Sequence, residues 1–162
     1  MRALVTRPRE DAEGLARALK TRGLEPVIAP LMDVFHFEDG PPLALEGVRA
    51  LLFTSANGAR AAARRTHRRD LPALCVGEAT ARTARDEGFR WVQVAGGDVT
   101  ALAALVKREL APGGVLVHVA GTRVAGDLAG LLDDFEVRRE ILYEARPVRQ
   151  LPAAAAEALR AR

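Results

Sequence analysis

The sequence predicts an α/β fold, and three features of its pattern support this prediction. Short apolar runs typical of buried strands alternate with alanine-rich and leucine-rich segments at helical spacing. Several of these runs end in small polar residues or glycine, as a strand does where a helix follows at once. Hydrophobic residues make up 49% of the 162 residues, which is enough for a packed core. Strands that alternate with helices favour a mostly parallel sheet flanked by helices.

Residues 1–32 predict a strand–helix–strand unit, the N-terminal part of a first lobe. Residues 2–6 are expected to form a short buried strand, and a helix with an apolar face follows and ends near Gly23. Val27-Ile28-Ala29, between two prolines, predicts the second strand. Residues 33–47 mix apolar and acidic side chains around a Gly-Pro-Pro interruption. They predict an extended connector between two lobes.

Residues 48–143 predict a second lobe, a five-stranded α/β unit inserted into the chain. Its strands are expected at residues 48–53, 71–76, 91–95, 115–119 and 137–143. Its helices are expected after Ser55 to about Arg69, at 80–87, from Asp98 or Thr100 to about Leu110, and along an apolar face of Val124, Leu128, Leu131 and Leu132. The pattern is that of a mostly parallel sheet with helical crossovers.

After this lobe the chain is expected to return to the first one. Residues 144–150 predict a second connector, and residues 151–162 predict the start of the second half of the first lobe. Pro152 opens a helix there that runs to Arg162 without a cap or a following element. A two-stranded lobe cannot bury much surface. We therefore expect the first lobe to be incomplete, either because the chain is missing its end or because another subunit supplies it.

Composition excludes several classes of partner and compartment. Aromatic residues are 4% of the chain and the net charge is +3, so the clustered basic and aromatic residues of a nucleic-acid site are not expected. The one cysteine, Cys75, lies in an apolar run and is expected to be a core thiol. No apolar stretch reaches transmembrane length, and the N-terminus does not have the pattern of a signal peptide. The sequence therefore predicts a cytoplasmic protein with no membrane or nucleic-acid partner.

Motifs for metal, nucleotide and covalent-nucleophile chemistry are missing from the sequence. No glycine-rich dinucleotide or phosphate loop follows a predicted strand, and no nucleophile elbow is present. The three histidines, His36, His67 and His118, have no metal-ligand spacing, and His118 lies in an apolar strand where a hydrogen-bonded core role is expected. We therefore expect no metal ion and no cofactor.

Polar turns follow four of the predicted strands. Because parallel strands present their carboxyl ends at one edge of a sheet, these turns are expected to share a binding edge. Helix N-termini there offer backbone N–H groups to anions, small residues let a ligand approach the backbone, and arginine can pair with carboxylates. For each hydroxyl or amide the alternative is an ordinary N-cap role. The candidate binding residues are Thr6, Arg7, Ser55, Ala56, Asn57, Gly58, Gly77, Thr80, Gly121 and Arg123.

Tyr143, the only tyrosine, closes the last strand of the second lobe. Its hydroxyl could face a crevice and donate a proton or a hydrogen bond to a substrate hydroxyl. The alternative is an amphipathic ring that packs at a strand end. The residues alone leave both roles open.

Five short motifs, in their order and spacing, resemble the uroporphyrinogen-III synthase family over essentially the whole chain. They are Leu4-Val5-Thr6-Arg7-Pro8, Phe53-Thr54-Ser55-Ala56-Asn57-Gly58, Val76-Gly77-Glu78-Ala79-Thr80-Ala81, Gly126-Asp127-Leu128 and Leu142-Tyr143-Glu144-Ala145. The resemblance implies two flavodoxin-like lobes joined by a two-stranded connector, with the first lobe built from both chain ends. Family members continue well past residue 162, so the resemblance also implies that the C-terminal portion is missing here. The full-length protein is expected to be a monomer.

The resemblance further implies an enzyme that needs no cofactor. Its substrate would be hydroxymethylbilane, a linear tetrapyrrole with several carboxylates, which is cyclised to uroporphyrinogen III with inversion of the last ring through a spiro intermediate. By motif match, Tyr143 is the candidate acid that assists loss of the hydroxyl, and Ser55 and Thr80 are crevice-lining hydroxyls. Arg7 and the turn amides would hold carboxylates.

A second hypothesis from a different class stays open. The chain could be a non-enzymatic α/β module that binds a carboxylate or phosphate ligand, or one that a partner chain completes. Positioning matters more than strong acids or bases in the cyclisation, so both hypotheses are compatible with polar turns at a sheet edge.

Overall fold

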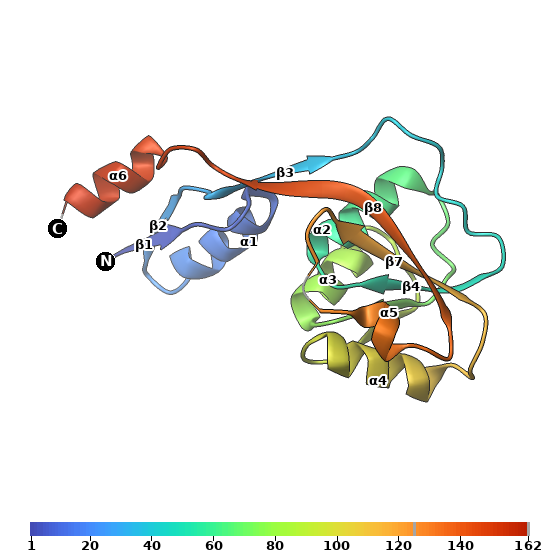
Figure 1. Ribbon diagram of the computed structural model, residues 1–162. Helices are drawn as coiled ribbons and strands as arrows, with labels where there is room; N and C mark the ends of the chain where they lie inside the picture. The colour runs from blue at the N-terminus through green and yellow to red at the C-terminus, as the bar shows by residue number, and fades with distance from the viewer. Residues whose placement is uncertain (125, 162) are drawn as a thin grey trace. The chain divides into compact units, whose positions relative to one another are not determined.

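The computed structural model describes residues 1–124 and 126–161, and within them the chain divides into two compact units. The smaller unit combines residues 1–35 with residues from 145 onward, and the larger unit spans residues 36–144. The smaller unit contains β1 (Arg2–Val5), α1 (Arg9–Lys20), β2 (Glu25–Ile28) and α6 (Ala153–Arg160) (Figure 1). The larger unit contains β4 (Val48–Phe53), α2 (Ala56–Arg65), β5 (Ala73–Cys75), α3 (Glu78–Asp86), β6 (Val92–Val94), α4 (Val99–Glu109), β7 (Val115–Gly121) and α5 (Leu128–Leu131). Strands β3 (Met32–His36) and β8 (Glu136–Pro147) belong partly to each unit.

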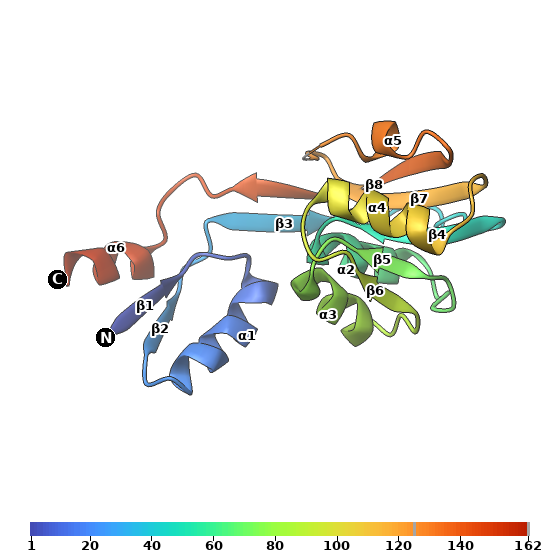
Figure 2. The ribbon, with the colours of Figure 1, turned by 90° about the horizontal axis from the view of Figure 1, so that it is seen from below.

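Six strands of the described residues form one sheet, in the order β3-β8-β7-β4-β5-β6. The pairs β8–β7, β7–β4, β4–β5 and β5–β6 are all parallel. Helices α4 and α5 cover one face of this sheet, and α2 and α3 cover the other (Figure 2). Because both faces are covered, the central strand β4 is almost wholly buried, from Val48 to Phe53.

The apolar core lies on both sides of the central strands. One cluster of buried side chains joins β4, β5 and β7 to α4 and α5 and includes Leu52, Leu102 and Leu116. On the other side, Phe53 packs against Phe89, with the two ring centroids 5.4 Å apart. This core fixes the strand ends, and the polar turns that follow them, on a rigid support.

The prediction of a mostly parallel α/β sheet flanked by helices is confirmed, and the five strands expected in the second lobe correspond to β4, β5, β6, β7 and β8. The sheet also has a sixth strand, β3, most of which lies in residues 33–47, the segment predicted to be an extended connector. Its residues alternate between half-buried and exposed, the pattern of a strand at the edge of a sheet. The neighbouring strand β8 runs to Pro147, beyond the predicted end at Tyr143.

Two predicted helices of the larger unit are shorter in the structure. Helix α2 ends at Arg65, because Thr66 adopts an extended conformation with φ −153°. The guanidinium of Arg69 instead donates to the carbonyls of Ala63, Thr66 and Glu87 and holds this segment outside the helix.

Helix α5 is a single turn that begins after Asp127, so the predicted apolar face starting at Val124 was wrong. Gly126, with φ +82°, precedes that turn in a conformation that a helix does not allow.

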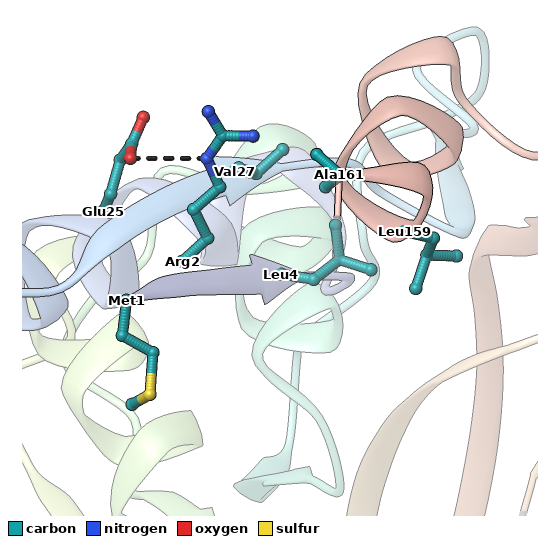
Figure 3. Close-up of a pocket in the computed structure, with 8 residues that line it drawn as sticks. Met1, Arg2, Leu4, Glu25, Val27, Leu159 and Ala161 are labelled. Carbon is teal, nitrogen blue, oxygen red and sulfur yellow. Dashed lines mark hydrogen bonds and ion pairs between the residues drawn. The ribbon is translucent and has the colours of Figure 1, made fainter.

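In the smaller unit, α1 connects the parallel strands β1 and β2, as the strand–helix–strand pattern predicts. Strand β1 was expected to be buried, but only Val5 is. Figure 3 shows Leu4 of β1 and Val27 of β2 beside Leu159 and Ala161 at the end of α6, around a pocket of about 540 Å³. Arg2 and Glu25 form an ion pair at its rim, with Nε and Oε2 3.4 Å apart. The predicted end of the last helix, Arg162, lies outside the described residues.

No helix among the residues that the structure describes is long and apolar enough to cross a membrane.

We expect replacement of Asp98 by alanine to lower the free energy of unfolding by about 1 kcal/mol. Asp98 is the N-cap of α4, where its Oδ1 accepts a hydrogen bond from the backbone N–H of Ala101 at 3.0 Å. Alanine leaves that N–H group without its acceptor, whereas asparagine keeps one. Urea unfolding of Asp98→Ala and Asp98→Asn measures the difference. Equal stability of the two variants would contradict the capping role.

Candidate functional site

A pocket of about 370 Å³ lies at the carboxyl ends of the parallel strands in the larger unit. Its lining comes from the turns after four strands and from β8. After β4 come Thr54 and Ser55, after β5 Val76, after β6 Asp98 and Val99, after β7 Arg123, Val124 and Gly126, and within β8 Tyr143. Open α/β sheets bind ligands at this edge. We therefore take this pocket as the candidate functional site.

Two of the lining residues, Ser55 and Tyr143, form a short hydrogen bond. Ser55 Oγ and the phenol oxygen of Tyr143 are 2.6 Å apart, although 88 residues separate them in the chain. Ser55 is also the N-cap of α2, and its Oγ accepts a hydrogen bond from the backbone N–H of Gly58 at 3.1 Å. Tyr143 is 8% exposed, so its ring is packed, and it is also one of the residues that line the pocket. The packing expected as one alternative for this tyrosine is confirmed, and its role as a donor to substrate stays a prediction.

A second polar pair involves Thr54, the residue before Ser55. Thr54 Oγ1 and His118 Nε2 are 3.0 Å apart, between the end of β4 and the middle of β7. His118 is 5% exposed, and burial, together with the positive charge of Arg139, lowers the pKa of its imidazole to about 4. The imidazole is therefore neutral at neutral pH, and it can hold the hydroxyl of Thr54 without adding charge to the pocket. The expected core role of His118 with a hydrogen-bond partner is confirmed.

Three predicted site residues, Ser55, Arg123 and Tyr143, line the pocket together. Arg123 is exposed, and it brings a permanent positive charge to the rim. The hydroxyls of Thr54, Ser55 and Tyr143 provide donors and acceptors, and three valines provide apolar surface. This combination suits a ligand with an apolar ring and an anionic side chain.

The other predicted residues of the α2 turn lie beside the pocket without lining it. Ala56, Asn57 and Gly58 form the first turn of α2, and Asn57 Oδ1 accepts a hydrogen bond from Arg60 at 3.0 Å. A Cβ on Gly58 would come within 2.8 Å of the carbonyl oxygen of Val119. The close approach that this glycine allows is therefore that of strand β7.

The remaining predicted residues also lie outside this pocket. Gly77 is the N-cap of α3 with open space around its Cα, and Thr80 is buried in the first turn of that helix. Gly121, at the end of β7, is covered by the ring of Tyr143. Thr6 and Arg7 are exposed residues between β1 and α1 in the smaller unit.

Sequence reasoning missed several residues of the pocket. They are Thr54, Val76, Asp98, Val99, Val124 and Gly126. Thr54, Val76 and Val124 stood in the polar turns, next to residues that were chosen. The signal for Thr54 was its place one residue before the N-cap of α2, but its partner His118 lies 64 residues away in the chain. Only the register of β4 against β7, which pairs Leu52 with His118, brings the two together.

The thiol of Cys75, in the larger unit, is unreactive at neutral pH. Cys75 is buried, and burial raises the pKa of its thiol to about 12. The thiolate required of a nucleophile is therefore not populated. In the part of the chain that the structure describes, no three His, Cys, Asp or Glu side chains are grouped as a metal ion would need.

Comparison with known proteins identifies one family. Residues 13–162 match the family model described as uroporphyrinogen-III synthase HemD. A search of the curated proteins finds no match. Among solved structures, a mutant uroporphyrinogen III synthase from the extremely thermophilic bacterium Thermus thermophilus is 17% identical, with a TM-score of 0.54 over 91% of this chain and 64% of that one. Uroporphyrinogen-III synthetase from Helicobacter pylori is 19% identical, with a TM-score of 0.56 over 84% of this chain and 62% of that one. The chain thus spans less than two thirds of the length of both structures, and the likeness concerns the fold.

Proposed function

We propose, from the premise that the chain belongs to the uroporphyrinogen-III synthase HemD family, that it acts as a uroporphyrinogen-III synthase. It would cyclise hydroxymethylbilane to uroporphyrinogen III with inversion of the last ring. The observation that carries this proposal is the pocket at the carboxyl ends of the strands, two of whose lining residues form the Ser55–Tyr143 hydrogen bond. It places a phenol, an alcohol and a guanidinium around one small cavity.

The size and lining of the pocket suit one part of the substrate. A volume of about 370 Å³ is near the lower end of the range for ligand sites, roughly 300–1,000 Å³. One pyrrole ring with its carboxylate side chains fits such a space better than a whole linear tetrapyrrole. The valines would contact the ring and Arg123 would pair with a carboxylate.

In the first chemical step, Tyr143 would act as a general acid on the leaving hydroxyl. The carbon–oxygen bond breaks as electrons from the pyrrole nitrogen form the exocyclic double bond, and the phenol proton leaves with the oxygen as water. The substituted ring carbon of the last pyrrole then attacks this cation and forms the spiro intermediate. The original bridge bond to that ring carbon breaks, and the chain recloses with the ring inverted. The proton released when the rings regain aromaticity returns to the phenolate, so Tyr143 ends the cycle as it began.

The remaining residues of the proposed substrate site act by positioning. Thr6, Arg7, Gly77, Thr80 and the amides of the α2 turn are proposed to contact carboxylates or to border the substrate. The proposed organisation places residues 1–32 and 151–162 in a first flavodoxin-like lobe and residues 48–143 in a second, with connectors at 33–47 and 144–150. The proposed full-length protein is a cytoplasmic monomer that uses no cofactor.

The test supplies hydroxymethylbilane to the purified 162-residue chain, oxidises the products and separates the porphyrin isomers. We expect isomer III above the background, at a rate that rises with protein concentration. The control is the same reaction with buffer in place of protein. There, the hydroxymethylbilane closes without inversion and gives isomer I. Isomer I alone at the rate of the buffer control would reject the enzymatic proposal. Saturable binding of the substrate with that outcome would favour a ligand-binding module instead.

A further inference from the structure

The strand that carries Tyr143 has a β-bulge immediately before it. In the pairing of β7 with β8, Ala120 lies opposite Ile141 and Gly121 lies opposite Tyr143, so Leu142 is an extra residue. The bulge is held from both sides: the N–H of Phe37 donates to the carbonyl of Leu142 at 2.9 Å, and the N–H of Thr122 donates to that of Tyr143 at 3.1 Å. Bulges next to functional sites change the direction of the side chain that follows. Here the side chain that follows is the phenol.

The ring of Tyr143 lies over the bare Cα of Gly121. A Cβ at Gly121 would be 2.7 Å from Cε2 and 2.9 Å from Cζ of the ring, closer than real Cβ contacts come. Gly121 is buried, and its φ does not lie in the left-handed region. The glycine is therefore required for space and not for backbone conformation. From the sequence, that space was expected to admit a ligand, but the ring of Tyr143 fills it.

With the ring over Gly121, the phenol oxygen of Tyr143 contacts Ser55, and Ser55 is itself held by the N-terminus of α2. Ser55 Oγ accepts the N–H of Gly58 at the N-terminus of α2 and lies 2.6 Å from the phenol oxygen. The phenol O–H is the more acidic of the two hydroxyls and therefore the better donor, and Ser55 Oγ has lone pairs for two donors. The favoured order is therefore Gly58 N–H to Ser55 Oγ, and phenol O–H to the same Ser55 Oγ. The phenol proton is then held at Ser55, in the pocket that both residues line.

We propose that Gly121 is a positioning residue for Tyr143, and that its bare Cα seats the ring so that the phenol O–H donates to Ser55 Oγ in the pocket that both residues line. The inference rests on the proposed function for its chemical meaning. The arrangement itself can be tested without turnover, because Tyr143 is the only tyrosine of the chain.

Ultraviolet resonance Raman spectra report whether a tyrosine hydroxyl donates or accepts a hydrogen bond, and here every tyrosine band comes from Tyr143. We expect the wild-type spectrum to be that of a donating phenol. Gly121→Ala, which displaces the ring, and Ser55→Ala, which removes Oγ, should both weaken that signature. The matched control is Gly14→Ala in α1, where an added Cβ meets nothing within 4 Å and the spectrum should stay unchanged.

One further measurement does not use Gly121→Ala, and it keeps the proposal open to refutation if that variant folds poorly. In wild-type protein, the ring above Gly121 should shift its Hα resonances upfield, and Tyr143→Leu should remove that shift. In the double variant with Ser55→Ala, Gly121→Ala should change the tyrosine spectrum no further, since both act through one contact. A wild-type phenol without a donor signature, unshifted Gly121 Hα resonances, or an unchanged spectrum in a folded Gly121→Ala variant would each overturn the proposal.

An activity measurement separates positioning from general damage to the fold. Gly121→Ala should lower kcat for isomer III by about 10- to 100-fold while changing KM little, as a misplaced catalytic group does. In the Tyr143→Phe background the same substitution should lower kcat no further. Additive losses of kcat would contradict action through Tyr143. If the chain makes no isomer III, the spectra still decide the positioning role, so the two failures can be told apart.

Discussion

Replacing Tyr143 by phenylalanine is expected to lower the rate of isomer III formation by roughly 10²- to 10⁴-fold, the usual contribution of a general acid. The substitution keeps the ring that covers Gly121 and removes only the oxygen that lies 2.6 Å from Ser55 Oγ. The leaving hydroxyl must then depart without a proton from the protein. Because the lost interaction exists only in the transition state, kcat and kcat/KM should fall by similar factors. Single-turnover formation of isomer III from hydroxymethylbilane measures the effect.

The matched control for this prediction is Phe135→Leu. The side chain of Phe135 packs against the core and does not line the pocket, and leucine keeps it apolar. It should retain isomer III formation within a few-fold, whereas Tyr143→Phe should not. Urea unfolding of both variants checks that they remain folded. A Tyr143→Phe rate within severalfold of wild type, in a folded protein, would show that the hydroxyl transfers no important proton.

The parts of the fold and the site that the sequence could predict are those specified locally. An apolar run that ends in Thr54-Ser55 and is followed by alanines gives β4, the N-cap of α2 and the helix itself, all within one short stretch of chain. The same local reasoning gives the Asp98 cap of α4. Each of these depends on neighbours in the chain, so hydrophobic period and capping chemistry are enough.

The contacts that make the site depend on pairing between distant strands. Ser55 and Tyr143 meet only because β4, β7 and β8 are adjacent and because a bulge at Leu142 redirects the side chain that follows. A one-residue difference in register moves a side chain to the other face of a sheet. The sequence contains no local sign of such a bulge, so the candidate residues could be chosen while their contacts could not.

The glycines show the same limit in another form. Gly58 and Gly121 were chosen because a bare Cα lets another group approach closely. The structure confirms the close approach at both, but the approaching groups are the carbonyl of Val119 and the ring of Tyr143. A glycine in a turn indicates that something comes near, and only the fold tells whether it is a ligand or the protein itself.

Lowering the pH from 7 to 5 is expected to cost about 2 kcal/mol of folding free energy through His118 alone. Its folded pKa is about 4, against an ordinary value of 6.5, because burial disfavours the imidazolium and Arg139 repels it. The unfolded chain therefore binds the proton first, and stability falls as the pH drops below 6.5 and stops falling near 4. The whole window corresponds to about 3 kcal/mol, since one pKa unit is worth about 1.4 kcal/mol.

Urea unfolding at several pH values between 7 and 5 measures this loss of folding free energy. The variant His118→Gln removes the imidazole that causes it. The amide of His118→Gln can still bond Thr54 but does not titrate, so its stability should change little over this range even if it is lower throughout. His67→Gln is the matched control, because His67 is exposed and its removal should leave the wild-type slope. The range stops at about pH 5 because carboxylates begin to titrate below it. An equal slope in His118→Gln and wild type would mean that the imidazole accepts its proton in the folded protein, and the neutral Thr54–His118 pair would then be wrong.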